Sequence, residues 1–167
     1  SKSTNMLNDV KHRTIAKDKC IIIKHTNDTR YDDLATRDNG VVCHSGFEYA
    51  SCDVIIAETI SNIDVSNYDT IGISEAQFFN DLLIVVEWAN AGKRIIAEGL
   101  SGTFRLEPFD TISSLIPHCE KVIKLFAVCS QCGKKASFTK KIAGDMQKTI
   151  DIGSGDKYVA VCRKCYH

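Results

Sequence analysis

Apolar runs rich in Ile and Val alternate with helix-compatible stretches along most of the chain. The runs predict strands at residues 19–26, 68–74, 93–100 and 120–129. Helices are predicted over 3–18, 80–92 and 109–117; Asn80 can cap the second and Gly92 can end it. Residues 52–63 suit either a strand or a helix. Because strands alternate with helices, we expect an α/β fold with a mainly parallel sheet and helices on both faces.

The character of the chain changes after Cys129. Short β-type segments follow at 136–142 and 157–162, with the glycine-rich stretch 153–155 between them. No convincing helix pattern occurs there. We therefore expect two domains, a nucleotide-binding α/β domain at 1–128 and a small β-rich lobe at 129–167.

Four cysteines of the small lobe form two Cys-x-x-Cys pairs, Cys129 with Cys132 and Cys162 with Cys165. Two such pairs can supply four thiolates to one tetrahedral Zn²⁺. A lobe of this size has little core, and a bound metal can replace one. Four protein ligands leave no open position, so the zinc would be structural. The alternatives are a pair of disulfides or free thiols.

Composition narrows the functional classes. The chain of 167 residues has 44% hydrophobic and 25% charged residues, as soluble globular proteins do. A net charge of zero gives no support for binding to nucleic acid or to a membrane surface. No apolar run approaches the roughly 20 residues of a membrane span, and no secretory signal leads the sequence. Paired metal-type cysteines favour a reducing compartment, so we expect a cytoplasmic protein.

A carboxylate follows the strand at 68–74. Glu75 comes directly after "TIGIS" and precedes Gln77 and two phenylalanines. In open α/β sheets, ligands bind outside the carboxyl ends of the strands. Glu75 is therefore a candidate catalytic group, and a solvated loop glutamate is the alternative.

The first residues, "SKST", match the end of a phosphate-binding loop, where Lys and Ser or Thr follow a glycine. They lead into a helix and then a strand, as in such a loop. The glycines and the preceding strand are not in the sequence, so we expect an N-terminal stretch before these residues.

A set of motifs spread over the chain resembles the type II thymidine kinases, the family of the cytosolic vertebrate and poxviral enzymes. The motifs are "KST", "NDTRY" (27–31), "HSG" (44–46), "IGISEAQFF" (71–79), "ANAGKRIIAEGLSGTFRLEPF" (89–109), "VIKLFAVCSQC" (122–132), "ASFTK" (136–140) and "GDKYVAVCRKCY" (155–166). The resemblance implies a P-loop α/β domain with a zinc-bearing lobe and a homotetramer. It also implies ATP with Mg²⁺ as phosphoryl donor and thymidine or deoxyuridine as acceptor.

By this resemblance Glu75 matches the catalytic base at the thymidine 5′-hydroxyl, Lys2 the phosphate-binding lysine and Ser3 the hydroxyl that reaches Mg²⁺. Phosphoryl transfer needs a carboxylate that orients the hydroxyl and accepts its proton. The implied ATP and magnesium site comprises Lys2, Ser3, Thr4, Asp28, Thr29, Arg30, Ser74 and Gln77. Asp28 and Arg30 would also suit an ordinary surface ion pair.

The implied thymidine site has apolar walls and a backbone segment that recognises the pyrimidine edge. It comprises Phe78, Leu100, Phe104, Phe109, Thr139, Tyr158 and the segment Thr149, Ile150, Asp151, Ile152 and Gly153. The zinc would anchor that segment. From the residues alone, phenylalanines and a leucine such as Leu100 belong more often to a hydrophobic core than to a pocket, and Tyr158 suits a strand.

Two positions depart from the family pattern, because Ser74 and Ser101 stand where aspartates are usual. The first is the acidic position expected near magnesium. The leading hypothesis is an active thymidine kinase. The alternatives are a catalytically weakened nucleotide-binding relative and a zinc-ribbon nucleic-acid-binding module, and the zero net charge disfavours the second of these.

Overall fold

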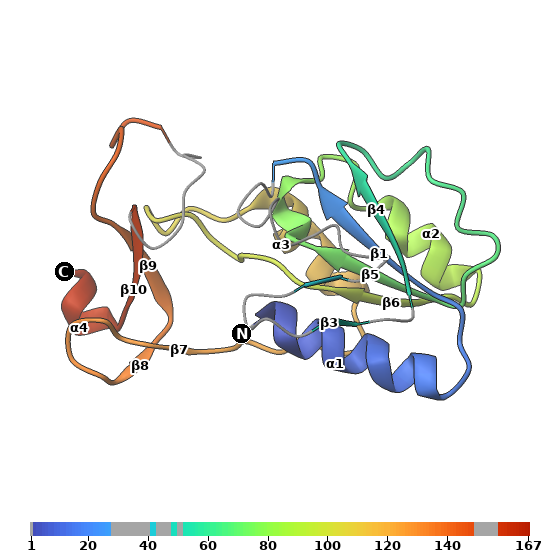
Figure 1. Ribbon diagram of the computed structural model, residues 1–167. Helices are drawn as coiled ribbons and strands as arrows, with labels where there is room; N and C mark the ends of the chain where they lie inside the picture. Colours follow the sequence, from blue (N-terminus) through green and yellow to red (C-terminus); the bar gives the residue numbers. More distant parts are fainter. Residues whose placement is uncertain (1, 28–40, 43–47, 50–51, 149–156) are drawn as a thin grey trace.

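A four-stranded parallel sheet forms the centre of the structure, a computed structural model that describes residues 2–27, 41–42, 48–49, 52–148 and 157–167 (Figure 1). The strand order is β4–β1–β5–β6. The bounds are Asp53–Ala57 for β4, Cys20–His25 for β1, Thr70–Ser74 for β5 and Arg94–Ala97 for β6. Each pairing is parallel, so the carboxyl ends of the strands share one edge. The predicted α/β class is confirmed.

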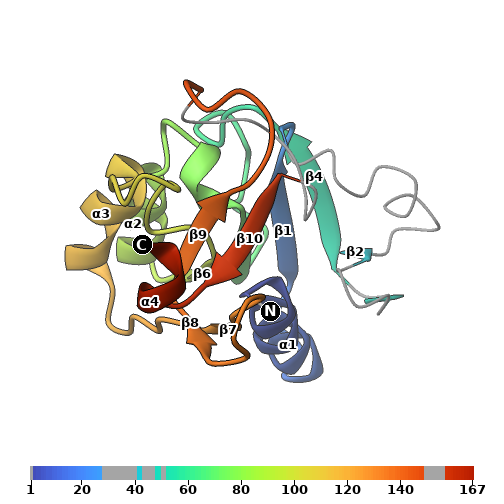
Figure 2. The ribbon, with the colours of Figure 1, turned by 90° about the vertical axis from the view of Figure 1, so that its left-hand side faces the viewer.

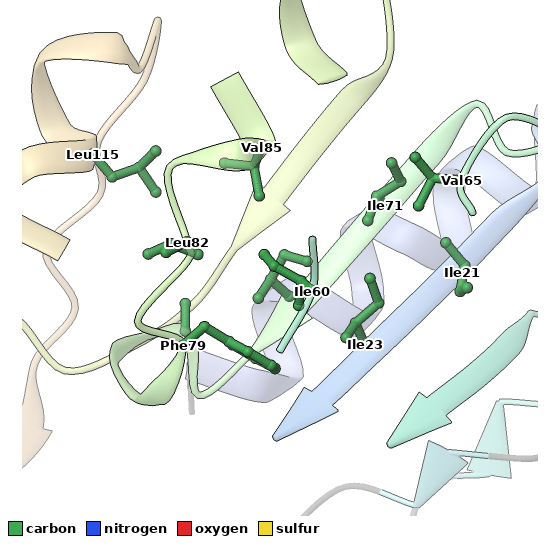
Figure 3. Close-up of a cluster of buried hydrophobic side chains, with 11 residues drawn as sticks. Ile21, Ile23, Ile60, Val65, Ile71, Phe79, Leu82, Val85 and Leu115 are labelled. Carbon is green, nitrogen blue, oxygen red and sulfur yellow. The ribbon is translucent and has the colours of Figure 1, made fainter. Parts of the chain in front are cut away.

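Helices cover both faces of this sheet, which explains why β1 and β5 are buried along their whole length. On one face, Ile22 packs against the helix α1 (Lys2–Ile15) through its buried residues Met6, Leu7 and Val10. The opposite face carries α2 (Ile84–Asn90) and α3 (Asp110–Leu115). Its core, drawn in Figure 3, includes Ile21, Ile23, Ile60, Val65, Ile71, Ile73, Phe79, Leu82, Val85 and Leu115.

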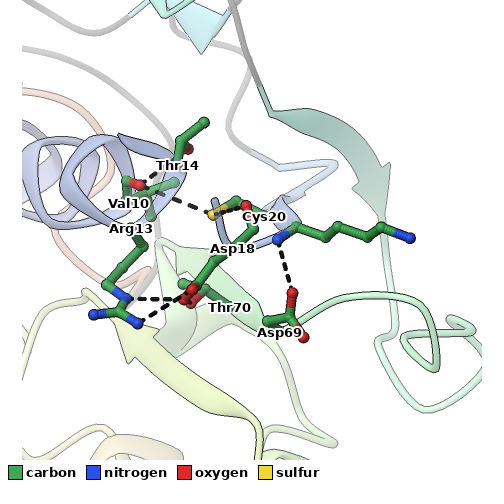
Figure 4. A network of polar contacts seen from close by, with 8 residues as sticks. Val10, Arg13, Thr14, Asp18, Cys20, Asp69 and Thr70 are labelled. Carbon is green, nitrogen blue, oxygen red and sulfur yellow. Dashed lines mark hydrogen bonds and ion pairs between the residues drawn. The ribbon is translucent and has the colours of Figure 1, made fainter. Parts of the chain in front are cut away.

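A polar network joins the loop after α1 to the amino-terminal end of β5 (Figure 4). Asp18 accepts hydrogen bonds from the Arg13 guanidinium at 2.8 Å and from the Thr70 hydroxyl at 2.8 Å. The backbone N–H of Lys19 donates to Asp69 at 2.8 Å. The network lies at the end of β5 away from Glu75, so its role is to fix α1 against the sheet.

The structure resolves the one ambiguous segment and moves the start of one predicted helix. The ambiguous 52–63 segment contains the strand β4. The helix predicted from residue 80 begins at Ile84, because the residues before it form turns and no side chain caps it. Asp81 accepts hydrogen bonds from the backbone of Ile60 and Ser61 instead. The expected Gly92 end is confirmed, since Gly92 has a φ of 88° just after the helix.

The strand predicted over 120–129 is largely absent. Only Ala127–Val128 is extended, as β7, which pairs with β8 (Lys135–Ala136) in the small lobe. Val122, Ile123, Leu125 and Phe126 are exposed. Among the described residues, none pairs as a strand with 120–126, and an apolar run without a pairing partner gains no ladder of hydrogen bonds.

The small lobe consists of antiparallel pairs and one short helix. β9 (Phe138–Lys141) pairs with β10 (Tyr158–Val161), and α4 (Arg163–Tyr166), which the sequence pattern did not predict, follows β10. Figure 2, seen from the side of the small lobe, shows β9 and β10 in front of the sheet. A further short pair, β2 (Val41–Val42) and β3 (Glu48–Tyr49), is antiparallel. No described helix has the length and apolarity to cross a membrane.

Candidate active site

The carboxyl ends of β5 and β6 bring two glutamates and two serines together. Glu75 and Ser74 come from the end of β5, Glu98 comes directly after β6, and Ser3 belongs to the first turn of α1. All of these side chains except that of Ser3 are buried. The edge that the sequence predicted to carry the ligand site is therefore where the buried carboxylates lie.

Glu75 adopts a backbone conformation that is unfavourable for a residue with a side chain. Its φ is 50° and its ψ is 47°, in the left-handed region. Its neighbours hold this turn, because Ala76 N–H donates to the Glu98 carbonyl at 2.9 Å and Phe78 N–H donates to the Glu75 carbonyl at 3.1 Å. Conformations of this kind cluster at functional sites. The side chain is 7% exposed, which contradicts the alternative of a solvated loop glutamate.

Gln77 fixes the carboxylate of Glu75. Its Nε2 donates to Glu75 Oε2 at 2.6 Å, and its Oε1 accepts from the Leu100 backbone N–H at 3.0 Å. Gly99 permits this approach, because a Cβ at that position would lie 2.7 Å from Gln77 Oε1. The structure thus places Gln77, expected in the ATP set, beside the candidate base.

Glu98 is a candidate functional residue that the sequence reasoning missed. The hydroxyls of Ser3 and Ser74 donate to its Oε1 at 3.1 Å and 3.0 Å. Burial and the neighbouring Glu75 raise the pKa of Glu98 above the ordinary value of a glutamate, and Lys2 opposes this rise. The sequence places Glu98 in a predicted strand but does not mark it as a site residue, because only the assembled sheet shows that this strand lies next to β5.

The expected phosphate-binding residues Lys2, Ser3 and Thr4 lie in the first turn of α1. The N-terminus of a helix attracts anions through its free N–H groups and its dipole. The structure brings this turn to the buried carboxylates through the bond from Ser3 to Glu98. The other residues expected at the phosphates, Asp28, Thr29 and Arg30, lie outside the described residues, as does the expected segment 149–153.

Two of the expected substrate residues, Phe104 and Tyr158, meet although they are distant in sequence. Their ring centroids are 6.3 Å apart, and the Lys141 Nζ lies 5.3 Å and 5.6 Å from the two centroids. Thr139 lies on β9 opposite Ala160 of the neighbouring strand. All six described candidates for the thymidine site are half-buried, neither full core nor fully exposed: Phe78, Leu100, Phe104, Phe109, Thr139 and Tyr158.

The small lobe is joined to the loop that follows β6 by side-chain to backbone hydrogen bonds. The Tyr166 hydroxyl donates to the Phe104 carbonyl at 2.7 Å. The Arg105 guanidinium donates to the carbonyls of Met146 and Gln147 at 2.9 Å and 3.0 Å. These bonds fix Phe104 and the residues just before 149 with respect to each other.

His25, at the end of β1, is a buried polar residue next to Phe78 that the sequence did not single out. Its ring centroid lies 5.6 Å from that of Phe78 and 4.7 Å from that of Phe79. Its Nδ1 accepts from the Asn27 N–H at 3.0 Å, and burial lowers its pKa. The lowered pKa favours the neutral form of the imidazole next to Phe78.

The four cysteines of the two predicted pairs form one cluster. The Sγ atoms of Cys129, Cys132, Cys162 and Cys165 all lie within 4.8 Å of one another. The backbone N–H of Cys162, with other nearby donors, lowers the pKa of Cys129 to about 6, whereas the neighbouring cysteines raise the pKa of Cys165 to about 12. Without a metal, the four sulfurs therefore do not all favour the thiolate, and a bound cation would stabilise that form. None of the four is in a disulfide. The geometry and donor set fit a tetrahedral metal site.

The chain matches the thymidine kinase family over residues 1–166. It is 43% identical to the thymidine kinase of raccoon poxvirus over 167 residues, covering 99% of this chain and 89% of the relative. Identity is 44% to the thymidine kinase of myxoma virus, strain Lausanne, and 41% to that of vaccinia virus, strain Western Reserve, with the same coverage. The chain therefore belongs to the thymidine kinase family and is a phosphotransferase of that family.

Proposed function

We propose that the chain transfers the γ-phosphoryl group of ATP to the 5′-hydroxyl of thymidine or deoxyuridine, with Glu75 as the general base. The observation that carries this role is the buried position of Glu75 at the end of β5, where Gln77 holds its carboxylate. A base must be within reach of the hydroxyl proton in a fixed orientation. The bond from Gln77 supplies that orientation.

The first turn of α1 is the ATP side of the site. Lys2 brings a positive charge and Ser3 a hydroxyl to a helix N-terminus, a combination that suits phosphate groups. Magnesium bound to the nucleotide would neutralise charge on the transferring group, and the Ser3 hydroxyl would be one of its ligands. Asp28, Thr29 and Arg30 stay predicted members of this site.

The thymidine side is formed by the half-buried residues around Phe104 and Tyr158, together with the 149–153 segment. The bonds from Arg105 to Met146 and Gln147 support this placement, because they hold the chain that enters the segment beside Phe104. Backbone groups have fixed donor and acceptor identities. A base with the reversed edge would leave buried polar groups unpaired, at a cost of roughly 1–3 kcal/mol each.

The four-cysteine cluster would hold a structural zinc at the base of this lobe, in a domain that we place at 129–167. A homotetramer in the cytoplasm, with no nucleic-acid or membrane partner, completes the proposal and rests on the family resemblance and the neutral net charge. The buried arrangement of Glu75 and Gln77 favours an active enzyme over a catalytically weakened relative.

A coupled assay with ATP tests the proposal. We expect saturable phosphorylation of thymidine and deoxyuridine, with kcat/KM for thymidine at least about tenfold above that for deoxycytidine, as one lost buried hydrogen bond implies. Comparable values for the two nucleosides would contradict the base-recognition claim, and no turnover with thymidine would support the weakened relative.

A further inference from the structure

The carboxylate of Glu98 is a buried charged group at the sheet edge to which the proposed function gives no role. It follows β6, it is 8% exposed, and it lies between the first turn of α1 and the end of β5. Glu98 N–H donates to the Ile73 carbonyl and its own carbonyl accepts from Ala76, so its backbone is fixed on both sides. The side chain is therefore held at this position by the sheet itself.

The two oxygens of this carboxylate have unequal surroundings. Oε1 accepts from the hydroxyls of Ser3 and Ser74, with Glu75 N–H at a longer 3.4 Å. Oε2 is buried, and it has no hydrogen-bond partner among the described residues. Buried carboxylate oxygens are normally paired, because an unpaired one loses its hydration without compensation. The buried, unpaired Oε2 of Glu98 therefore indicates that a cation binds here.

The donor set around Glu98 is that of a hard divalent cation. A carboxylate and serine hydroxyls offer oxygen ligands, which Mg²⁺ prefers, and Mg²⁺ keeps several waters that a small set of protein oxygens can hold. Glu75 differs from Glu98 in that its Oε2 is bonded to Gln77. Gln77 therefore orients the Glu75 carboxylate to accept a proton, whereas Glu98 has an oxygen that can bind a metal.

We propose that Glu98 is the metal-side carboxylate of this enzyme and, with the Ser3 hydroxyl, holds the divalent cation that accompanies ATP. Ser74, at the position where an aspartate is usual, donates to Glu98 and orients it. Ser74 at the end of β5 brings no negative charge, and Glu98, just after the adjacent strand β6, supplies that charge instead. The inference rests on the proposed use of ATP.

Manganese binding tests the assignment independently of turnover. Mn²⁺ is titrated by electron paramagnetic resonance into the full-length protein with a non-hydrolysable ATP analogue and without thymidine. We expect Glu98→Gln, which keeps the shape of the side chain, to weaken Mn²⁺ binding by at least about 10–100-fold, the loss typical of a disturbed metal shell. Glu87→Gln, at an exposed position on α2, is the matched control and should bind Mn²⁺ as the unaltered protein does.

A rescue variant separates a metal ligand from a structural residue. Glu98→Ala combined with Ser74→Asp returns one carboxylate to the site from β5, and we expect Mn²⁺ affinity within about tenfold of the unaltered protein's. Unchanged Mn²⁺ affinity in Glu98→Gln would overturn the proposal, and so would a folded double variant that binds no Mn²⁺. If the unaltered protein fails to phosphorylate thymidine but Glu98→Gln still loses Mn²⁺, the proposed function is wrong and the metal assignment stands.

Discussion

At the scale of single residues, the site depends on a few side chains that the backbone holds in unusual places. Glu75 keeps a left-handed conformation that costs on the order of 1–3 kcal/mol, and its neighbours around β5 and β6 maintain it. Gly99 leaves room for Gln77, and Gln77 fixes the carboxylate. The turn thus directs a carboxylate to one point at the end of the sheet.

Replacing Glu75 by Gln tests its role as the base. The variant keeps the shape of the side chain but cannot accept a proton, and losses of a general base are typically on the order of 10²–10⁴-fold. We expect kcat to fall by about that factor while the Kd for thymidine, measured by calorimetry, changes little. Glu87→Gln serves again as the control. Undiminished turnover in Glu75→Gln would remove Glu75 from the mechanism.

At the scale of helices and strands, apolar pattern predicted the buried elements well. β1, β5 and β6 lie within the predicted runs because each has an isoleucine-rich centre; β1 and β5 are buried along their whole length, and the two isoleucines of β6 are half-buried. The 120–129 run failed because a strand depends on its pairing partner, which the run itself does not encode. Glu98 could not be assigned for a related reason, since its importance comes from Ser3 and Ser74, which only the assembled sheet brings to it.

The hydrogen bonds that join α1 to the sheet should make the stability of the fold fall at low pH. The Arg13 hydrogen bond, together with that of Thr70, lowers the pKa of Asp18. Because the folded pKa lies below the unfolded value of about 3.9, the stabilising contribution is complete above that value and is lost as the pH falls through the folded pKa. We therefore expect Asp18→Asn to lower Tm at pH 7 and to remove part of the decline in Tm below pH 4.

Thermal unfolding of the two proteins between pH 2 and pH 7 checks this expectation. Asp9→Asn, which changes an exposed aspartate on α1 for which no polar contact is described, is the matched control and should leave the profile unaltered. Parallel Tm profiles for Asp18→Asn and the unaltered protein would show that the network in Figure 4 does not contribute to stability.

At the scale of the whole molecule, the proposed site combines residues of the sheet edge with residues of the small lobe. The sheet supplies Glu75 and Glu98, and the lobe supplies Tyr158 and Lys141 on β9 and β10. The contact of Tyr166 with the Phe104 carbonyl connects the residues after Cys165 directly to the expected thymidine pocket. Loss of metal from the four-cysteine cluster should therefore weaken thymidine binding, although the cluster takes no part in the phosphoryl transfer itself.

Removal of metal tests this connection. We expect about one zinc per chain by elemental analysis, because two Cys-x-x-Cys pairs provide one complete tetrahedral set. The core of the lobe is small, with Cys129, Ala136 and Val161 as its buried members, so metal binding should supply much of its folding free energy.

Chelation, or Cys162→Ser, should accelerate hydrogen exchange in β9 and β10 and abolish thymidine binding, while β1 and β5 stay protected. Cys119→Ser, at an exposed cysteine outside the cluster, is the control and should keep both zinc and binding. Well-folded protein without zinc would refute the metal site, and metal-free protein with unchanged thymidine affinity would refute its link to the substrate.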